Sequence, residues 1–190
     1  MPLNFNPEKI DARQLQDNLR AIERHLQDDH YVRSLSPGAA VLQTATHTVI
    51  GNRWGVVLMP DAADTSCLWT LLRPSEWVTG KVAVTLWYSS NGGSTNNFRV
   101  LTQVSAIKNA DVTSASTLLL NSTRTLAGPA VLNTLTRADV VYSTANITRD
   151  HELLEFRVQR TGTHADDNNV NEFHLYAVRA TFISAYAEVT

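Results

Sequence analysis

Charged residues and cysteine are both scarce in this chain of 190 residues. Only 18% of the residues are charged, against a usual ~25%, and the formal net charge is −2. Because no strong global field attracts nucleic acid or an anionic membrane, neither partner is expected. The single cysteine, Cys67, excludes an intrachain disulfide, and no Cys/His cluster indicates a zinc site. Since Cys67 lies in an apolar run, we expect a buried, unreactive thiol.

Long apolar runs are missing as well. No stretch reaches the ~18 apolar residues that a membrane-spanning helix needs. Met1–Asn6 lacks the basic start and apolar core of a signal peptide. The chain is nevertheless 43% hydrophobic, enough for one sizeable core, and Thr, Ser and Asn fill many polar positions. This composition favours β-structure in one domain with a small appendage.

The first 35 residues carry the helical pattern of the chain. Asn6-Pro7-Glu8 has the residue types of a helix start. Apolar residues then recur three and four positions apart, between polar neighbours: Ala12, Leu15, Leu19, Ile22 and Leu26. We expect an N-terminal α-helix that makes its contacts through Leu15, Leu19, Ile22 and Leu26. The stripe suits either a seam against other helices or packing on the helix's own domain.

Strand and turn patterns follow the break at Ser36-Pro37-Gly38. They predict an antiparallel β-sandwich over residues 36–190, with the helical segment at 1–35. The strands are expected at Ala40–Ile50, Arg53–Met59, Cys67–Leu72, Lys81–Ser89, Asn97–Ile107, Thr117–Arg124, Val131–Leu135, Asp139–Ile147, Glu152–Arg160 and Glu172–Ala185.

Two turns predict hairpins. The stretch Glu152–Tyr186 has two alternating arms around a polar loop of Gly, Asp and Asn. Asn91-Gly92-Gly93 lies between two further β-rich runs. Several strands are apolar on both faces, with Trp87 and Leu175 as surplus apolar residues. Such a surplus indicates either a subunit interface or residues that loops cover.

The sequence resembles a known class of viral domain. The relevant runs are Leu-Trp-Tyr-Ser-Ser at Leu86–Ser90, Asn-Phe-Arg-Val at Asn97–Val100, and the arms and loop of Leu153–Arg179. They are similar to jelly-roll domains of tailed-phage appendage proteins, in which a strand carrying an Arg precedes a Gly/Asp-rich loop. Asn6–Leu26 resembles the short helical leaders that attach such domains to the virion.

The resemblance implies a non-enzymatic structural protein of a tailed-phage virion. As a homotrimeric head-decoration (cement) or short-fibre protein, it would dock by its N-terminal helix and project a jelly-roll knob. Its partners would be copies of itself and a major capsid protein or a tail or baseplate protein. The alternative is a carbohydrate-binding receptor-recognition module of a tail fibre, with a host-surface glycan as partner. Neither function requires a cofactor.

Candidate chemistry is sparse. The six His residues are scattered without metal-ligand spacing, and no nucleophile elbow or phosphate loop is present. The loop residues Asp166, Asp167 and Asn168 are candidates for glycan contact; a hard cation or a solvated turn are the other interpretations of this run. Trp77, in the least regular context of the tryptophans, is expected to be exposed and to stack on sugar.

Overall fold

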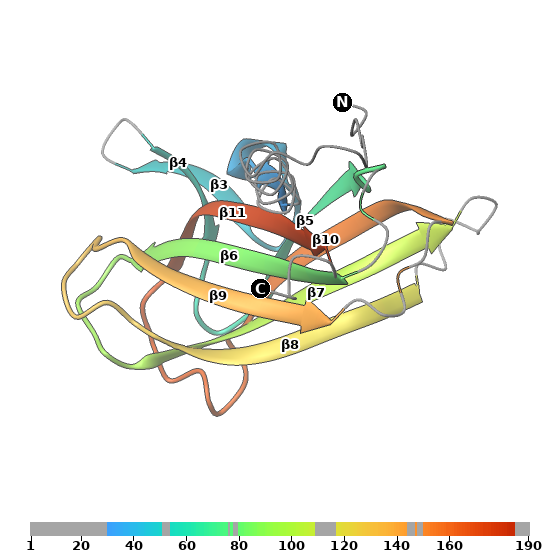
Figure 1. The fold of residues 1–190 in the computed structure, drawn as a ribbon. Helices are drawn as coiled ribbons and strands as arrows, with labels where there is room; N and C mark the ends of the chain where they lie inside the picture. The colour runs from blue at the N-terminus through green and yellow to red at the C-terminus, as the bar shows by residue number, and fades with distance from the viewer. Residues whose placement is uncertain are drawn as a thin grey trace, which may run out of the picture.

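The computed structural model describes residues 30–50, 54–75, 77, 80–108, 117–143, 147 and 150–184. Over these residues the chain is mainly β (Figure 1). The elements are β1 (His30–Leu35), the 3-10 helix η1 (Pro37–Ala39), β2 (Val41–Gln43), β3 (Thr46–Ile50), β4 (Trp54–Met59), β5 (Asp64–Leu72), β6 (Gly80–Ser90), β7 (Asn97–Lys108), β8 (Thr117–Ala127), β9 (Thr136–Ser143), β10 (His151–Thr161) and β11 (Phe173–Ser184).

The strands form two antiparallel sheets that pack as a sandwich. Sheet A has the order β3-β4-β11-β6-β9, and β1 pairs with β11 beside this path. Sheet B has the order β2-β5-β10-β7-β8. The expected antiparallel β-sandwich is therefore confirmed. The expected N-terminal helix, with Leu15, Leu19, Ile22 and Leu26, lies outside the described residues and stays a prediction.

The pairing from β4 onward is nested. β7 pairs with β8, β6 with β9, β5 with β10, and β4 with β11, all antiparallel. This is the pattern of one long antiparallel ribbon rolled into two sheets, which is the topology of a jelly roll. Further pairing, of β10 with β7 and of β11 with β6, joins these pairs of strands into the two sheets.

The core lies between the sheets and follows the two-residue period of the strands. Alternate residues of β6 and β10 point inward and are almost fully buried, among them Val84, Leu86, Phe156 and Val158. The Phe156 and Phe182 rings, from opposite sheets, meet edge to face with centroids 6.2 Å apart. Burial of each such side chain stabilises the fold by about 1.5–3 kcal/mol.

Cys67 belongs to this core, as expected. Its side chain is buried on β5, and its thiol lies 3.8 Å from the Val158 carbonyl oxygen. Burial raises the pKa of the Cys67 thiol well above its ordinary value. The thiol is consequently protonated and unreactive in the folded protein.

Both predicted hairpins are wrong. β10 belongs to sheet B and β11 to sheet A, so the loop between them crosses from one sheet to the other. The same holds for β6 and β7 around Asn91-Gly92-Gly93. A turn shows where the chain reverses, but the partner of each strand is decided by which neighbouring strands bury its apolar face.

Three strand predictions also need correction. Residues 131–135 form turns, with Asn133 in the left-handed region at a φ of 57°. The expected strand at 40–50 is divided into β2 and β3 at Thr44, which also has a φ of 57°. Finally, β1 lies in the segment assigned to the helix, so the sandwich includes residues from His30 onward. Among the residues that the structure describes, no helix is long and apolar enough to cross a membrane.

Candidate functional site

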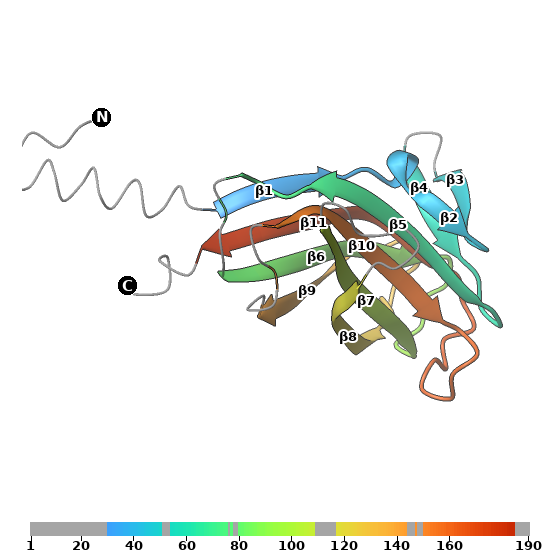
Figure 2. The same ribbon diagram turned by 90° about the vertical axis from the view of Figure 1, so that its right-hand side faces the viewer.

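Sheet A has a split in its hydrogen bonding along one side of β11. The first residues of β11, Phe173–Leu175, pair with β4, whereas Val178–Ile183 pair with β1. Between these two partners no strand of the described residues pairs with Tyr176 or Ala177 on this side, and the register with β6 shifts at the same place. Figure 2 shows β1 at one end of this side of the sheet and β3–β4 at the other. Because β11 changes its strand partner here, the surface of sheet A is open between β4 and β1.

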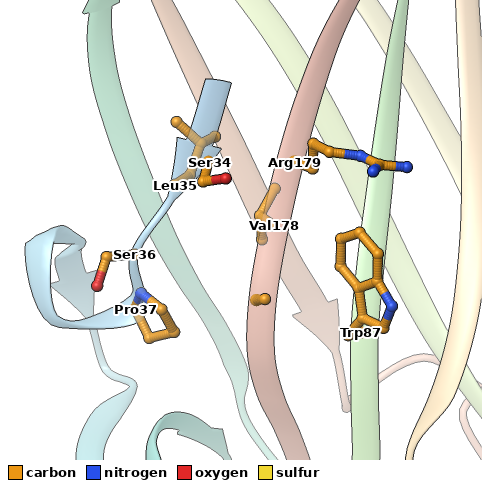
Figure 3. A pocket seen from close by; sticks show the side chains of 8 residues that line it. Ser34, Leu35, Ser36, Pro37, Trp87, Val178 and Arg179 are labelled. Carbon is orange, nitrogen blue, oxygen red and sulfur yellow. The ribbon is translucent and has the colours of Figure 1, made fainter. Parts of the chain in front are cut away.

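A groove of about 360 Å³ lies at this split. One wall is the strap, the name used below for residues 34–37, which join β1 to η1. The opposite wall is Trp87 of β6 (Figure 3). Ala177 and Val178 of β11 line the groove between these walls. Small-molecule sites usually measure ~300–1,000 Å³. The groove is therefore large enough for a short ligand.

The strap is held in place from both sheets. Trp69 of β5 donates a hydrogen bond from Nε1 to the Ser36 carbonyl oxygen at 2.8 Å. His47 of β3 bonds through Nε2 to the Pro37 carbonyl oxygen at 2.7 Å. Since a carbonyl only accepts, His47 is the donor. The groove thus has a preformed wall, which reduces the conformational entropy that the protein loses when a ligand binds.

Trp87 and Arg179 lie side by side on the outer face of sheet A. The guanidinium carbon of Arg179 is 5.1 Å from the centroid of the Trp87 ring, a cation–π distance (Figure 3). Both side chains are half-buried. Arg179 makes no hydrogen bond or ion pair with any described residue, and its Nε is a buried donor without a partner. The groove therefore presents an aromatic surface beside an uncommitted cation.

A carboxylate near this pair already has two partners. Asp139 of β9 accepts a hydrogen bond from Thr85 at 2.6 Å and forms an ion pair with Arg137 at 2.8 Å. Burial alone would raise the pKa of Asp139, but the bonds from Thr85 and Arg137 and the charges of Arg137 and Arg179 together lower it. Asp139 is therefore ionised at neutral pH.

The loop end of the sandwich, where residues 162–172 join β10 to β11, is organised around Arg160. Its side chain is 0% exposed and makes two hydrogen bonds to the buried Asp167, at 3.0 and 2.8 Å. It also donates to the backbone carbonyls of Met59, Asn169 and Asn171, and to Asp61. The loop is thus fixed from within by one charge whose donors are satisfied.

The sequence-predicted glycan contacts occupy three different environments. Trp77 is 0% exposed: its ring packs against Phe182 at 5.2 Å and its Nε1 donates to the Ile183 carbonyl oxygen. The expectation that Trp77 is exposed is wrong, because this tryptophan closes the end of the core opposite the loop. Asp167 is buried under Arg160, whereas Asp166 and Asn168 are exposed at the loop tip.

The exposed loop residues are themselves held by the fold. Asp166 forms an ion pair with Arg99. The Asn168 side chain accepts a hydrogen bond from the Asn97 amide at 2.7 Å. In the described ranges of the chain, no group of three or more His, Cys, Asp or Glu residues is placed to hold a metal ion.

Sequence reasoning missed Trp87, Arg179 and the strap as parts of one site. Trp87 was recognisable as a surplus apolar residue on the outer face of its strand, and it does lie there. Leu175, the other surplus residue, is fully buried instead. Nothing in the local sequence shows that β1 and β4 share one side of β11, so the groove itself has no local sequence signature.

Comparison with known proteins shows likeness in structure alone. No protein-family model matches the sequence. No curated protein matches it either. A family 35 carbohydrate binding module from Clostridium thermocellum is similar with a TM-score of 0.54 and 14% identity, over 82% of this chain and 99% of that chain.

Two larger enzymes contain a similar region. Arthrobacter globiformis T6 isomalto-dextranase, solved with panose, is similar with a TM-score of 0.55 and 17% identity over 78% of this chain, which spans 23% of the enzyme's length. The cycloalternan-forming enzyme from Listeria monocytogenes, solved with a pentasaccharide substrate, has a TM-score of 0.51 and 11% identity, over 77% of this chain and 12% of that chain. At these identities the likeness establishes the fold: a two-sheet jelly-roll sandwich of the kind found in carbohydrate-binding modules.

Proposed function

We propose that the chain is a non-catalytic carbohydrate-binding module and that the groove between the strap and Trp87 is its saccharide site. The observation that carries this proposal is the position of Trp87. Its indole forms one wall of a preformed groove on the outer face of sheet A, rather than part of the core.

The groove has the composition that saccharide recognition requires. A sugar ring presents an apolar C–H face and a rim of hydroxyl groups, so it needs an aromatic surface together with a few polar groups. Trp87 supplies the apolar surface, and Ser34, Ser36 and Arg179 supply the polar groups. A groove of 360 Å³ limits the bound portion to a short saccharide.

The fold supports the same proposal independently. The family 35 carbohydrate binding module is matched over 99% of its length, so this chain carries the fold of a whole module. Because one fold serves many functions, this support is by analogy, and the groove carries the chemical argument.

Calorimetry with saccharides tests the proposal directly. The full chain is first screened against gluco-, xylo-, manno-, galacto- and isomalto-oligosaccharides, and the best binder is titrated into three variants. Trp87→Ala removes the aromatic wall, Ala177→Leu puts a larger side chain between the two walls, and Leu72→Ala removes an apolar side chain that is 70% exposed on sheet B.

We expect Trp87→Ala and Ala177→Leu each to weaken binding at least about tenfold, as loss of a buried aromatic anchor does. Leu72→Ala should leave the affinity unchanged. Thermal unfolding by circular dichroism checks that each variant is folded. If no saccharide binds, or if folded Trp87→Ala binds as tightly as the wild type, the proposal is wrong.

The loop tip is a second candidate contact, because Asp166 and Asn168 are exposed and are bonded to Arg99 and Asn97. Asp166→Ala and Asn168→Ala measure its part in the same titrations. A loss of affinity here, with none in Trp87→Ala, would move the saccharide site to the loop.

The virion role stays a prediction. Nothing in the described residues or in the comparisons shows a phage origin, a trimer or a capsid partner. Native mass spectrometry of the full chain tests the expected homotrimer, and Leu19→Asp tests the helix that was predicted to hold it together. A wild-type monomer would contradict the trimer, and an unaffected trimer in Leu19→Asp would contradict the role of the helix.

A further inference from the structure

We propose that the groove selects saccharides that carry an anionic group, a carboxylate or a sulfate ester, and that Arg179 binds this group. The inference rests on the proposed function, since it names the class of saccharide that the same groove takes.

The first observation is that Arg179 has neither a hydrogen bond nor an ion pair within the described residues, whereas other arginines there have a carboxylate partner. Arg99, Arg137 and Arg160 each pair with a carboxylate. Arg179 forms no hydrogen bond or ion pair with the described part of the chain. Its side chain is nevertheless half-buried and packs against the Trp87 ring. A guanidinium in this position retains several N–H donors for a ligand.

The second observation is an excess of positive charge beside the groove. Asp139 is near enough for Arg179 to lower its pKa, but its oxygens already accept from Thr85 and Arg137. Two guanidinium groups therefore share one carboxylate. An anionic ligand would balance the second of these two positive charges, whereas a neutral sugar would not.

The third observation is the position of Arg179 relative to the aromatic wall. Across the sheet, Arg179 is in register with Ser34 of β1 and Thr85 of β6, one row from Ala177 and Trp87. A sugar ring that packs on the Trp87 wall thus has its substituents beside the guanidinium. The planar fork of Arg matches a carboxylate or a sulfate through two parallel bonds, and contact with Trp87 orients the fork.

Matched pairs of ligands separate charge from ring structure. Oligogalacturonate is compared with its neutral methyl ester, and a sulfated galacto-oligosaccharide with its desulfated form, by calorimetry at low salt. We expect the charged member of one pair to bind about ten- to a hundredfold tighter, as hydrogen bonds to a charged group do. The pair that shows the preference identifies the anionic group as carboxylate or sulfate.

Variants of Arg179 then assign the preference. Arg179→Gln should bind both members of the pair equally, at the level of the neutral ligand. Arg179→Lys keeps the positive charge but lacks the planar guanidinium, so it should retain only part of the preference for the charged ligand. Arg124→Gln, an equal loss of charge at an exposed position of β8, should retain all of it.

The results distinguish this inference from the proposed function. If saccharides bind and Trp87→Ala weakens them, but no charged member is preferred, the inference is wrong and the function stands. A preference that survives in Arg179→Gln also overturns it. If no saccharide binds in any form, both fail.

Discussion

Two arginines, at the loop end and in the groove, stand over aromatic rings in nearly the same way. The Arg160 guanidinium carbon is 4.9 Å from the Phe98 centroid, and that of Arg179 is 5.1 Å from the Trp87 centroid. Arg160 is nevertheless fully buried and bonded to Asp167, Asp61 and three carbonyls, whereas Arg179 is half-buried and bonded to none of the described residues.

The comparison shows that the surroundings of an arginine decide whether its charge stabilises the fold or is available to a ligand. A buried charge is tolerated only when its donors are satisfied, so Arg160 is committed to holding the loop. A charge that is only half-buried, at a surface groove, can leave some of its donors free for a ligand. The same side chain therefore stabilises the fold at one site and remains available to a ligand at the other.

The largest expected effect separates these two roles. Arg160→Met should destabilise the protein by about 3–5 kcal/mol, because it leaves Asp167 buried without its partner. Arg179→Met should change stability by less than about 0.5 kcal/mol, as surface substitutions usually do. Urea unfolding followed by circular dichroism measures both.

The buried thiol offers an independent check on this pair. Labelling of Cys67 at pH 8 requires the fold to open, because the thiol is buried and its pKa is raised. Labelling should be faster in Arg160→Met and unchanged in Arg179→Met. Equal labelling rates in the two variants would contradict the division of roles.

A glycine at the loop end sharpens the comparison further. A methyl group at Gly128 would overlap the Ser94 carbonyl oxygen and the Asn169 side chain, and would lie 2.8 Å from the Asn96 carbonyl oxygen. Backbone oxygens cannot move aside cheaply, so Gly128→Ala should cost about 1–3 kcal/mol. Gly55→Ala is the matched control, since a methyl group at Gly55 meets nothing within 4 Å. Equal unfolding midpoints in urea would show that the loop end is not tightly packed.

The smallest expected effect concerns His174, on the part of β11 between the two regions. Its ring is 4% exposed; Nε2 lies 3.4 Å from the Glu172 carboxylate, and Nδ1 has no partner. Burial lowers the pKa of His174 more strongly than Glu172 raises it. The unfolded chain therefore binds the proton more readily, and stability should fall as the pH drops below about 6.5.

The test of this pH dependence is a comparison of variants. His174→Gln should lose part of the decrease in unfolding free energy between pH 7 and pH 5. His164→Gln, at an exposed loop position, should keep all of it. If His174→Gln shows the same decrease as the wild type, protonation of His174 is not the cause.

Much of the fold could be predicted because its signals are local. Alternating residues identified the stretches around β6 and β10, and their inward faces are the ones that are buried. The hairpins were wrong because turns at 91–93 and 161–171 do not determine which sheet receives the next strand. The prediction that Trp77 is exposed was wrong because an irregular local sequence does not show whether a side chain is buried.

The site was less predictable for the same reason. Asp166 and Asn168 were correctly expected in a loop, but the burial of Asp167 depends on Arg160, seven positions earlier in the chain. Trp87 and Arg179 lie far apart in the sequence and meet only because β6 and β11 pair. Pairs of this kind have no spacing that a sequence pattern could reveal.

The sequence by itself determined that this chain forms strands with one strongly apolar face and packs them as a sandwich, since the two-residue period and the turn residues are properties of neighbours in the chain. Only the tertiary structure decided which charge is buried and which is free, and where a groove opens. Those features depend on which strands lie beside β11, and strand partners are selected by burial over the whole molecule rather than by local sequence.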